Sequence, residues 1–446
     1  MDGPVLTKSG WIRGVGLNGY TVFRGVPYAE APVGELRWKR PVPVEHWDGE
    51  YYADTFRNMC PQALPDPETP WGAGYHKEFY SNPEYIPPMS EDCLYLNIWV
   101  PDSAGSGSAL PVAFYIHGGG FSGGYGSEME FDGAAFCEKD VILVTINYRT
   151  GIFGFFAHPW LDRENELGIS GNYGTLDQIA ALEWIHENIA AFGGNPDNIT
   201  VFGQSAGSMS TQVLISSPLT EGLIAKAVLQ SGISCEDHLL YTPTLEEEER
   251  IGEDFVRITG SGSLEELREL SWEELLKYKE RLDRENFLKL HDALVLVPNV
   301  DGHVLKKTVN EVWKDAEMAP IPTMAGLTLD DLGTTPEKVR RKEYGPLLDE
   351  CRRWSIVCGK AHQKPAYIYC FSHALPGGDW GANAFHSSEL WYVMGTLGRC
   401  WRPMEQADYD LSGEMVSAWT NFMKSGEPGG GWEAYTEENP YIQEFS

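Results

Sequence analysis

The sequence predicts an α/β protein whose central, mostly parallel sheet is flanked by helices. Three observations support this class. From residue 94 onward, continuous apolar runs alternate with helical stretches, a pattern typical of parallel strands buried on both faces. One of these runs leads directly into Gly-x-Ser-x-Gly and a helix-like stretch. The 446 residues are 42% hydrophobic, enough for one large core, although two or three average domains also fit this length.

The N-terminal part differs from the rest of the chain. Residues 1 to about 60 are rich in Gly, Pro and aromatic residues and contain short alternating runs, which predict small antiparallel strands. Residues 61–90 show no periodicity and predict a long loop. Its aromatic residues either line the mouth of a pocket or pack the loop down, and packing is the more common role. These residues are Trp71, Tyr75, Phe79 and Tyr80.

The predicted sheet uses most of the remaining apolar runs. Its strands are residues 94–100, 110–116, 141–147, 199–202, 226–229, 322–327 and 366–371. Residues 176–191 repeat apolar positions at the helical period and stop before Gly193-Gly194-Asn195-Pro196. Further helices are predicted in the charged stretch 245–282 and at 411–424. No repeat or linker divides the chain, so we predict one domain over 1–446, with a helical insertion around 240–315.

Composition limits the possible partners. The formal net charge of −31 argues against nucleic acid and anionic membrane surfaces. An acidic mouth that attracts cationic ligands is one interpretation of this charge, and simple solubility is the other. No signal peptide and no apolar run of membrane-spanning length is visible, which predicts a cytoplasmic protein. The eight cysteines are scattered without a Cys-x-x-Cys pair, so no zinc site is expected.

The strongest local signal is the run from Asn198 to Gly207, which reads NITVFGQSAG. A buried strand, a sharp turn and a helix in this order are the context of a nucleophile elbow, which holds the hydroxyl of Ser205 exposed. Gly203 and Gly207 suit so tight a turn because they lack side chains. The five-residue motif alone is weak evidence, since an ordinary strand-to-helix turn fits it equally well.

A serine nucleophile needs a base and an acid that orients the base, in the chain order serine, acid, histidine. Six of the eleven histidines follow Ser205, namely His238, His291, His303, His362, His373 and His386. His386 is the best candidate because it lies in a Gly-rich loop after a predicted strand, although a solvent-exposed histidine fits that position too. The preceding strand ends in Asp330-Asp331, and either carboxylate is a candidate acid.

The third requirement is a set of donors for the tetrahedral oxyanion. His117-Gly118-Gly119-Gly120-Phe121 follows a predicted strand, where a loop of bare backbone can approach a substrate. A flexible glycine turn is the simpler explanation of this run. The order of Gly triplet, elbow, acid and histidine along the chain favours the catalytic interpretation.

Together these segments resemble the type-B carboxylesterase family, which includes carboxylesterases, cholinesterases and some lipases. The resemblance covers almost the whole chain. Its motifs are residues 23–29 (FRGVPYA), 90–97 (SEDCLYLN), 171–178 (GNYGTLDQ), 192–196 (FGGNP), 386–390 (HSSEL) and 419–422 (WTNF). The resemblance implies the α/β-hydrolase fold and hydrolysis of carboxylic esters through an acyl-enzyme, without a cofactor or metal.

The resemblance also implies roles for single residues. Ser205 matches the nucleophile, His386 the base and Asp331 the acid. The amides of Gly119, Gly120 and Ala206 match the oxyanion hole, and Ser231 matches a serine behind the triad. The ion pairs Arg37–Glu91 and Arg149–Asp177 and a disulfide between Cys60 and Cys93 are implied as well. From their positions beside the motifs, Phe121, Trp391 and Met394 are predicted pocket walls, with core packing an equal alternative for Met394.

Several positions depart from the family pattern. Gln204 stands where the family commonly has Glu, which removes a charge beside the triad and changes the expected pKa of His386. The acid is Asp instead of the usual Glu, and Leu332 replaces the Gly that usually follows it. Only 55 positions separate Asp331 from His386, so the segment 332–385 is shortened and we expect a reshaped pocket mouth.

The sequence therefore predicts a serine carboxylesterase for esters with small to medium acyl groups. Two alternatives are weighed against it. One is a non-catalytic binding or adhesion protein of the same fold, against which the intact Ser205, Gly triplet and His386 argue. The other is a lipase or amidase. The natural ester and the oligomeric state do not follow from the sequence.

Overall fold

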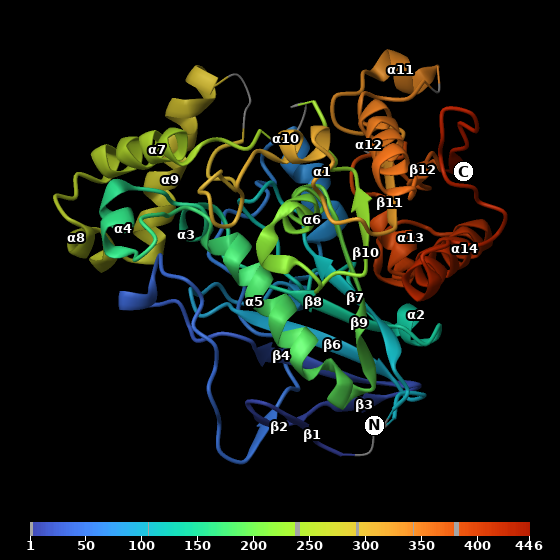
Figure 1. The fold of residues 1–446 in the computed structure, drawn as a ribbon, viewed down its shortest axis with the longest axis horizontal. Coiled ribbons are helices and arrows are strands. Elements are labelled where there is room, and N and C mark those ends of the chain that lie inside the picture. Colours follow the sequence, from blue (N-terminus) through green and yellow to red (C-terminus); the bar gives the residue numbers. More distant parts are fainter. Residues whose placement is uncertain (1–2, 106, 237–240, 291–293, 342, 379–382) are drawn as a thin grey trace.

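The computed structural model describes residues 3–105, 107–236, 241–290, 294–341, 343–378 and 383–446 (Figure 1). Within these ranges ten strands form the main sheet. In the order in which they lie side by side, they are β13 (Gln443–Phe445), β12 (Tyr367–Phe371), β11 (Thr323–Thr328), β10 (Lys226–Gln230), β9 (Gly194–Gln204), β7 (Leu110–Ile116), β8 (Ile142–Ile146), β6 (Tyr95–Pro101), β4 (Tyr20–Pro27) and β3 (Val15–Leu17). The pairs from β13 to β8 are parallel. The pairs β8–β6, β6–β4 and β4–β3 are antiparallel. The predicted mostly parallel sheet is therefore confirmed.

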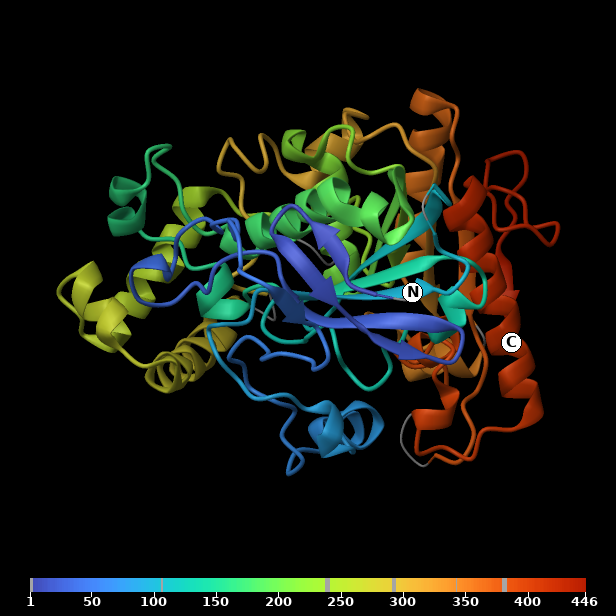
Figure 2. The same cartoon turned by 90° about the horizontal axis from the view of Figure 1, so that it is seen from below.

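A second, small sheet lies in the N-terminal part, where the sequence predicts small antiparallel strands. It consists of β1 (Val5–Thr7), β2 (Gly10–Arg13) and β5 (Glu50–Tyr52). β1 and β2 pair antiparallel, whereas β2 and β5 pair parallel. Seen from below, the N-terminal strands lie in front of the rest of the molecule, across the middle of the view (Figure 2). Apolar residues of β1 and β2 point inward and join the main core, including Val5 and Ile12.

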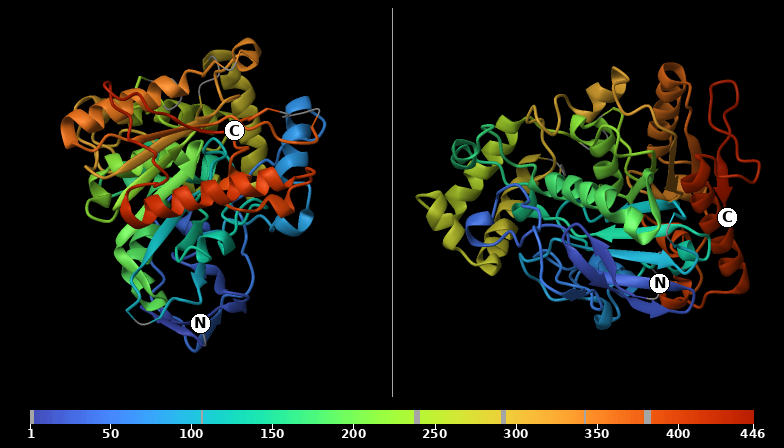
Figure 3. Two further views of the ribbon diagram at one scale, coloured as in Figure 1. Left: turned by 90° about the vertical axis from the view of Figure 1, so that its right-hand side faces the viewer. Right: turned by 60° about the horizontal axis from the view of Figure 1, so that its bottom comes forward.

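Helices cover both faces of the main sheet. α5 (Tyr173–Asn188) and α6 (Ala206–Ser216) pack against β9, and α12 (Leu347–His362) packs against β11 and β12. α14 (Gln406–Ser425) packs against β7 and β9. Figure 3 (left) shows α12 and α14 on opposite sides of the strands. The strands between them are buried along nearly their whole length, because side chains on both faces meet a helix layer.

The charged stretch 245–282, which the sequence predicts to be helical, forms three helices. They are α7 (Leu245–Thr259), α8 (Leu264–Glu269) and α9 (Trp272–Leu290). Gly260 ends α7 in a left-handed conformation, and Ser263 caps the start of α8. These helices lie together at one end of the molecule (Figure 1). They fall within the insertion predicted around 240–315, and the division of the chain into domains stays a prediction.

Residues 61–90 contain a helix, which the sequence analysis missed. α1 (Pro70–Phe79) begins after Thr69, whose hydroxyl accepts a hydrogen bond from the amide of Gly72 at 3.1 Å. Proline at the first helical position and a threonine cap are a recognised start signal. Three glycine and proline residues in ten hide the helical period, which explains the wrong prediction of a loop. The side chain of Trp71 lies outside the described residues.

The remaining helices are short. They are α2 (Ala134–Cys137), α3 (Gly151–Gly154), α4 (Pro159–Glu164), α10 (Val309–Lys314), α11 (Pro336–Arg340) and α13 (Leu390–Val393), with 3₁₀ turns at Gly34–Leu36, Pro83–Tyr85, Ile189–Phe192, Pro218–Thr220 and Leu397–Arg399. Within the described residues, none of the helices combines the length and apolar character needed to cross a bilayer.

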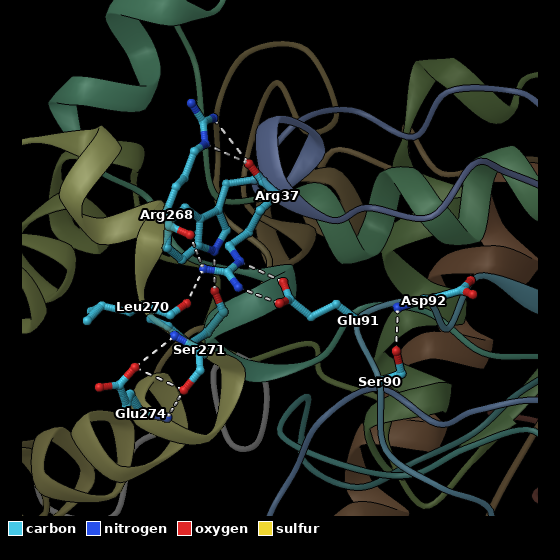
Figure 4. Close-up of polar contacts among 10 residues, drawn as sticks. Arg37, Ser90, Glu91, Asp92, Arg268, Leu270, Ser271 and Glu274 are labelled. Carbon is cyan, nitrogen blue, oxygen red and sulfur yellow. Dashed lines mark hydrogen bonds and ion pairs between the residues drawn. The ribbon is translucent and has the colours of Figure 1, made fainter.

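Two buried ion pairs tie distant segments together, as the family resemblance implies. Arg149 binds Asp177 through Nη2–Oδ1 at 2.7 Å and Nε–Oδ2 at 2.8 Å. Arg37 binds Glu91 and also donates to the carbonyl oxygens of Arg268 (2.9 Å) and Leu270 (2.7 Å), as Figure 4 shows. Arg37 therefore connects the N-terminal part to the segment that joins α8 and α9.

The cysteine pair implied by the resemblance is present as two free thiols. Cys60 and Cys93 are both buried. A hydrogen bond between the two thiols, together with burial, raises the pKa of Cys93. The structure therefore brings the two side chains into contact without a disulfide.

Candidate active site

Ser205 occupies a strained turn between β9 and α6. Its backbone angles are φ 57° and ψ −126°, which cost free energy for a residue with a side chain. Its amide donates to the carbonyl oxygen of Gln230 at 2.8 Å, which holds the turn in place. A Cβ at Gly203 would lie 2.4 Å from the carbonyl carbon of Gly207, and one at Gly207 would lie 2.0 Å from the carbonyl oxygen of Ile116. The two glycines are therefore required for this close approach.

His386 and Asp331 are brought together from two loops at the carboxyl end of the sheet. Asp331 follows β11, and its Oδ1 lies 2.6 Å from Nδ1 of His386. The side chain of Asp331 is fully buried, and that of His386 is 21% exposed. Asp330, the alternative acid, instead donates its backbone amide to the carbonyl oxygen of Ala384 at 2.8 Å. The geometry therefore pairs His386 with the second of the two adjacent carboxylates.

The surroundings of Asp331 favour its ionised form. Burial alone would raise its pKa, but the charge and hydrogen bond of His386 and the hydroxyl of Ser231 hold the pKa below its usual value. The amides of Thr328 and Leu332 also donate to its two oxygens, at 2.9 and 2.8 Å. Conversely, burial would lower the pKa of His386, and the carboxylate of Asp331 outweighs this effect and raises it.

Gln204 makes a contact that residue identity did not predict. Its Oε1 accepts a hydrogen bond from the hydroxyl of Ser387 at 3.0 Å. Its Nε2 lies 3.3 Å from Nε2 of His386. Because the carboxylate of Asp331 keeps a proton on Nδ1, Nε2 of His386 is an acceptor and the Gln204 amide is its donor. The residue before Ser205 therefore contacts the ring nitrogen of His386 that Asp331 does not bind.

The glycine triplet lies beside Ser205. Gly119 and Gly120 have φ angles of 100° and 60°, and a Cβ at Gly119 would lie 2.3 Å from the carbonyl oxygen of Gly123. Ala206 is the first residue of α6. Among the described residues, none accepts a hydrogen bond from the amides of Gly119, Gly120 and Ala206. The three N–H groups are therefore free to bind an oxygen atom from outside the protein.

Ser205, His386 and the glycine triplet line one cavity of about 790 Å³. The rim includes Leu276 of α9 and the exposed side chains of Leu294 and Leu332. The cavity is large enough to bury most of a small or medium organic molecule.

The predicted pocket walls Phe121, Trp391 and Met394 are fully buried in the core and are not among the residues that line this cavity. Phe121 packs against Phe155, and Trp391 stacks on Phe79 and donates to Glu78. Their neighbours in the sequence, Gly120 and Leu390, line the cavity instead. Adjacent residues of a loop or helix point in different directions, which explains the difference.

Two buried groups lie behind the His386–Asp331 pair. Ser231, the serine that the resemblance implies, has a positive φ of 51° and is 1% exposed. Glu389 is fully buried on the chain after His386, and burial together with the charge of Asp331 raises its pKa to about 8. The sequence analysis did not single out Glu389, although its position three residues after His386 was the available signal.

Among the described residues, the other candidate histidines His303, His362 and His373 do not line this cavity. His373 binds Asp408 at 2.8 Å, and the amide of His303 donates to Asp301. His238 and His291 lie outside the described residues. Among those described, no cluster of three or more His, Cys, Asp and Glu side chains is arranged to hold a metal ion.

Comparison with known proteins identifies the family of the chain. The model of the carboxylesterase family matches residues 2–347 and 344–445. The para-nitrobenzyl esterase of Bacillus subtilis (strain 168) is 34% identical, covering 97% of this chain and 93% of its own. The fumonisin B1 esterase of Sphingopyxis macrogoltabida is 32% identical, covering 97% and 84%.

Solved structures agree as well. A thermophylic PNB esterase matches with a TM-score of 0.84 and 31% identity, covering 100% of this chain and 96% of its own. Its resemblance in structure extends over the sheet and the helices around it, which gives this chain the α/β-hydrolase fold. The chain belongs to the carboxylesterase family, and its activity is the hydrolysis of carboxylic esters.

Proposed function

We propose that the protein hydrolyses carboxylic esters through an acyl-enzyme formed on Ser205, with His386 as general base and Asp331 as the acid that orients it. The observation that carries the proposal is the 2.6 Å contact between His386 and Asp331 at a cavity that Ser205 also lines. A serine on a strained turn, an imidazole and a buried carboxylate are the three groups that nucleophilic acyl transfer requires.

The reaction proceeds in two steps. Ser205 Oγ attacks the ester carbonyl carbon while its proton passes to Nε2 of His386. The tetrahedral intermediate then collapses, the carbon–oxygen bond to the alcohol breaks, and the alcohol leaves with the proton from His386. Water attacks the acyl-enzyme by the same route, giving the carboxylic acid and restoring Ser205. Asp331 stays ionised throughout and stabilises the imidazolium.

The amides of Gly119, Gly120 and Ala206 are proposed to bind the oxyanion. They make no hydrogen bond to the described residues, and that of Ala206 starts a helix, where the macrodipole favours negative charge. Such donors stabilise the charge that develops on the carbonyl oxygen more than they stabilise the neutral ester.

Gln204 is proposed to position the imidazole behind the nucleophile. Its amide donates to Nε2 of His386 in the resting site, the atom that must accept the proton of Ser205. The imidazole has one acceptor lone pair at this atom, so the Gln204 contact is exchanged for the Ser205 hydrogen bond at the start of the reaction.

The substrate class is proposed from the cavity. A volume of about 790 Å³ with a partly apolar rim fits esters with small to medium acyl groups. A cytoplasmic location stays a proposal that rests on the sequence analysis.

The test is hydrolysis of 4-nitrophenyl butyrate by the purified protein and by Ser205→Ala. The parent is expected to turn over and to be labelled once, on Ser205, by a 4-nitrophenyl phosphonate. Ser205→Ala is expected to lose at least about 10⁴-fold in kcat. Ser208→Ala is the matched control, because Ser208 lies on the same helix and does not line the cavity.

An inactive parent would favour the non-catalytic alternative. A profile of acyl-chain length separates the remaining possibilities. A preference for long chains with activation at an interface would identify a lipase instead of an esterase for small acyl groups.

A further inference from the structure

The cavity contains a second group of polar side chains besides the proposed catalytic residues. Glu128 and Glu130 lie on the segment between β7 and α2, and both line the cavity that Ser205 and His386 line. They are 8% and 3% exposed. We call these two glutamates, with the aromatic residues around them, the acidic subsite. The proposed hydrolysis does not use either carboxyl group.

Aromatic side chains surround the two glutamates. Tyr75 of α1, Tyr80 directly after this helix, Tyr115 of β7 and Phe131 line the same cavity. Tyr115 and Phe131 pack edge to face with ring centroids 4.7 Å apart, and Tyr75 and Tyr80 lie 6.2 Å apart. Aromatic faces carry the negative end of a quadrupole, so such a wall attracts positive charge.

The acidic subsite has more acceptors than donors. The hydroxyl of Tyr80 donates to Oε1 of Glu128 at 2.9 Å. Among the described residues, Oε2 of Glu130 has no hydrogen-bond partner, although it is buried. No lysine or arginine in the described part of the structure forms an ion pair with Glu128 or Glu130. A buried carboxyl group without a partner costs free energy, and a donor or cation from a ligand would remove that cost.

The positive charges of the cavity lie elsewhere and are compensated. Lys277 and Lys279 of α9 also line it. Nζ of Lys279 lies 2.7 Å from Asp283, and Lys277 is exposed to solvent, which screens its charge. Among the described residues, neither of these lysines is therefore paired with a carboxyl group of the acidic subsite.

We propose that the acidic subsite binds a positively charged amine group of the substrate, so that the protein prefers esters that carry an ammonium group in their acyl or alcohol part. This inference rests on the proposed function, because it concerns the same cavity. The ammonium group contacts the carboxylates of Glu128 and Glu130 and the surrounding aromatic faces while the ester carbonyl reaches Ser205.

The protonation of the two glutamates agrees with this role. Burial raises the pKa of Glu128 to about 7, and burial together with the charge of Glu128 raises the pKa of Glu130 well above its ordinary value. Two close carboxyl groups of this kind share a proton when no cation is present. When an ammonium group binds, its positive charge can compensate the carboxylates in place of the shared proton.

The test uses two pairs of esters that differ only in charge. The first pair is 4-nitrophenyl 4-(trimethylammonio)butanoate and 4-nitrophenyl 5,5-dimethylhexanoate, which carry the charge or its carbon isostere in the acyl part. The second pair is 2-(trimethylammonio)ethyl butanoate and 3,3-dimethylbutyl butanoate, which differ in the alcohol part. In at least one pair, kcat/KM is expected to be about tenfold or more higher for the cation. Equal or lower values for the cation in both pairs would overturn the inference.

Variants locate the preference. Glu130→Gln and Glu128→Gln keep the side-chain shape and remove a charge. Each is expected to reduce the ratio of cationic to neutral kcat/KM at least about threefold. Glu138→Gln is the matched control, because Glu138 is exposed outside the cavity and changes the net charge equally. An unchanged ratio in Glu128→Gln/Glu130→Gln would overturn the inference.

A measurement on the unmodified protein does not depend on variants that fold. Pentyltrimethylammonium chloride is expected to inhibit hydrolysis of the neutral 5,5-dimethylhexanoate ester competitively, at concentrations where sodium chloride has no effect. Absence of inhibition counts against the acidic subsite. If the neutral ester is itself not hydrolysed, the proposed function fails. If it is hydrolysed without any preference for the cation, only this inference fails.

Discussion

The buried carboxyl groups in and beside the cavity are in opposite chemical states. Beside the cavity, Asp331 receives hydrogen bonds from His386 and from the amides of Thr328 and Leu332, and its pKa lies below the usual value. In the cavity, the pKa values of Glu128 and Glu130 are raised. All three side chains are buried, so burial alone does not decide the difference in charge. The donors and cations around each carboxyl group contribute to it as well.

The core holds another buried acid whose hydrogen-bond donors are built into the fold, although burial still raises the pKa of this carboxyl group. Asp177 is fully buried, and Arg149 offers it two side-chain donors and a backbone amide. Asp331 and Asp177 are thus matched acids, whose donors are built into the fold. Glu128 and Glu130 are unmatched acids, and their positive partner is proposed to arrive with the substrate. Removing a matched acid should harm the protein, and removing an unmatched acid should not.

The largest effect is expected for the matched acid beside His386. Asp331→Asn should lower kcat for 4-nitrophenyl butyrate by roughly 10³- to 10⁴-fold, because the amide neither fixes the tautomer of His386 nor stabilises the imidazolium. Asp330→Asn is the control and should stay within about twofold, since its contact to Ala384 is made by the backbone. The reverse result would move the role of the acid to Asp330.

The matched acid of the core should affect stability instead of turnover. Asp177→Asn leaves the guanidinium of Arg149 buried without its counterion, so the free energy of unfolding should fall by roughly 3–5 kcal/mol. Urea denaturation measures this change. Glu187→Gln is the control, because the Lys8–Glu187 pair is half exposed and should contribute less than about 1 kcal/mol. Equal effects of the two changes would mean that burial adds nothing to the Arg149–Asp177 pair.

Removal of an unmatched acid is expected to increase the free energy of unfolding, whereas removal of a matched acid decreases it. The folded protein raises the pKa of Glu130 above its unfolded value, so stability is lost as the pH rises between these two values. Glu130→Gln removes this loss and should raise the free energy of unfolding by roughly 1–2 kcal/mol at pH 8. The gain should shrink at pH 5.5, where Glu130 is protonated in the folded protein. Destabilisation at pH 8 would place Glu130 among the matched acids.

The sequence predicted those parts of the site that local patterns determine. The elbow, the glycine triplet and the loop of His386 each depend on a run of neighbouring residues, and the structure brings all three to one cavity. The direction of the turn after β11 decides whether the side chain of Asp330 or that of Asp331 faces His386. No pattern of neighbouring residues predicts that direction. The contact of Gln204 with His386 also joins residues from distant segments.

The acidic subsite could not be predicted for a similar reason. Glu128 and Glu130 are alternate residues of an irregular loop, and two glutamates in a loop normally face solvent. Their burial results from packing against α1, a helix whose glycine and proline content hides its period. Tyr80, one of the aromatic residues named from sequence, lies at that contact. Packing between segments therefore decides the side chains that the sequence leaves open.

The smallest expected effect concerns the imidazole that the matched acid controls. His386 accepts the proton of Ser205 only when Nε2 is unprotonated, and Asp331 raises the pKa of His386 above 6.5. Activity is therefore present above that pKa and is lost as the pH falls through it, about tenfold per unit in kcat/KM. A neutral ester is the substrate of choice for this profile, so that charge in the acidic subsite does not contribute.

Gln204→Glu tests whether the side chains in contact with His386, or its burial, set the pKa of this residue. A carboxylate at this position would lie close to Nε2 of His386, where the Gln204 amide now lies at 3.3 Å. Its charge should raise the pKa of His386 further and move the acidic limb of the profile up by about half a unit to one unit. At pH 7 this shift lowers kcat/KM only a few-fold, and the loss is recovered at pH 9. A limb that stays in place would show that Asp331 alone sets the charge of His386, and that Gln204 acts only by holding the ring.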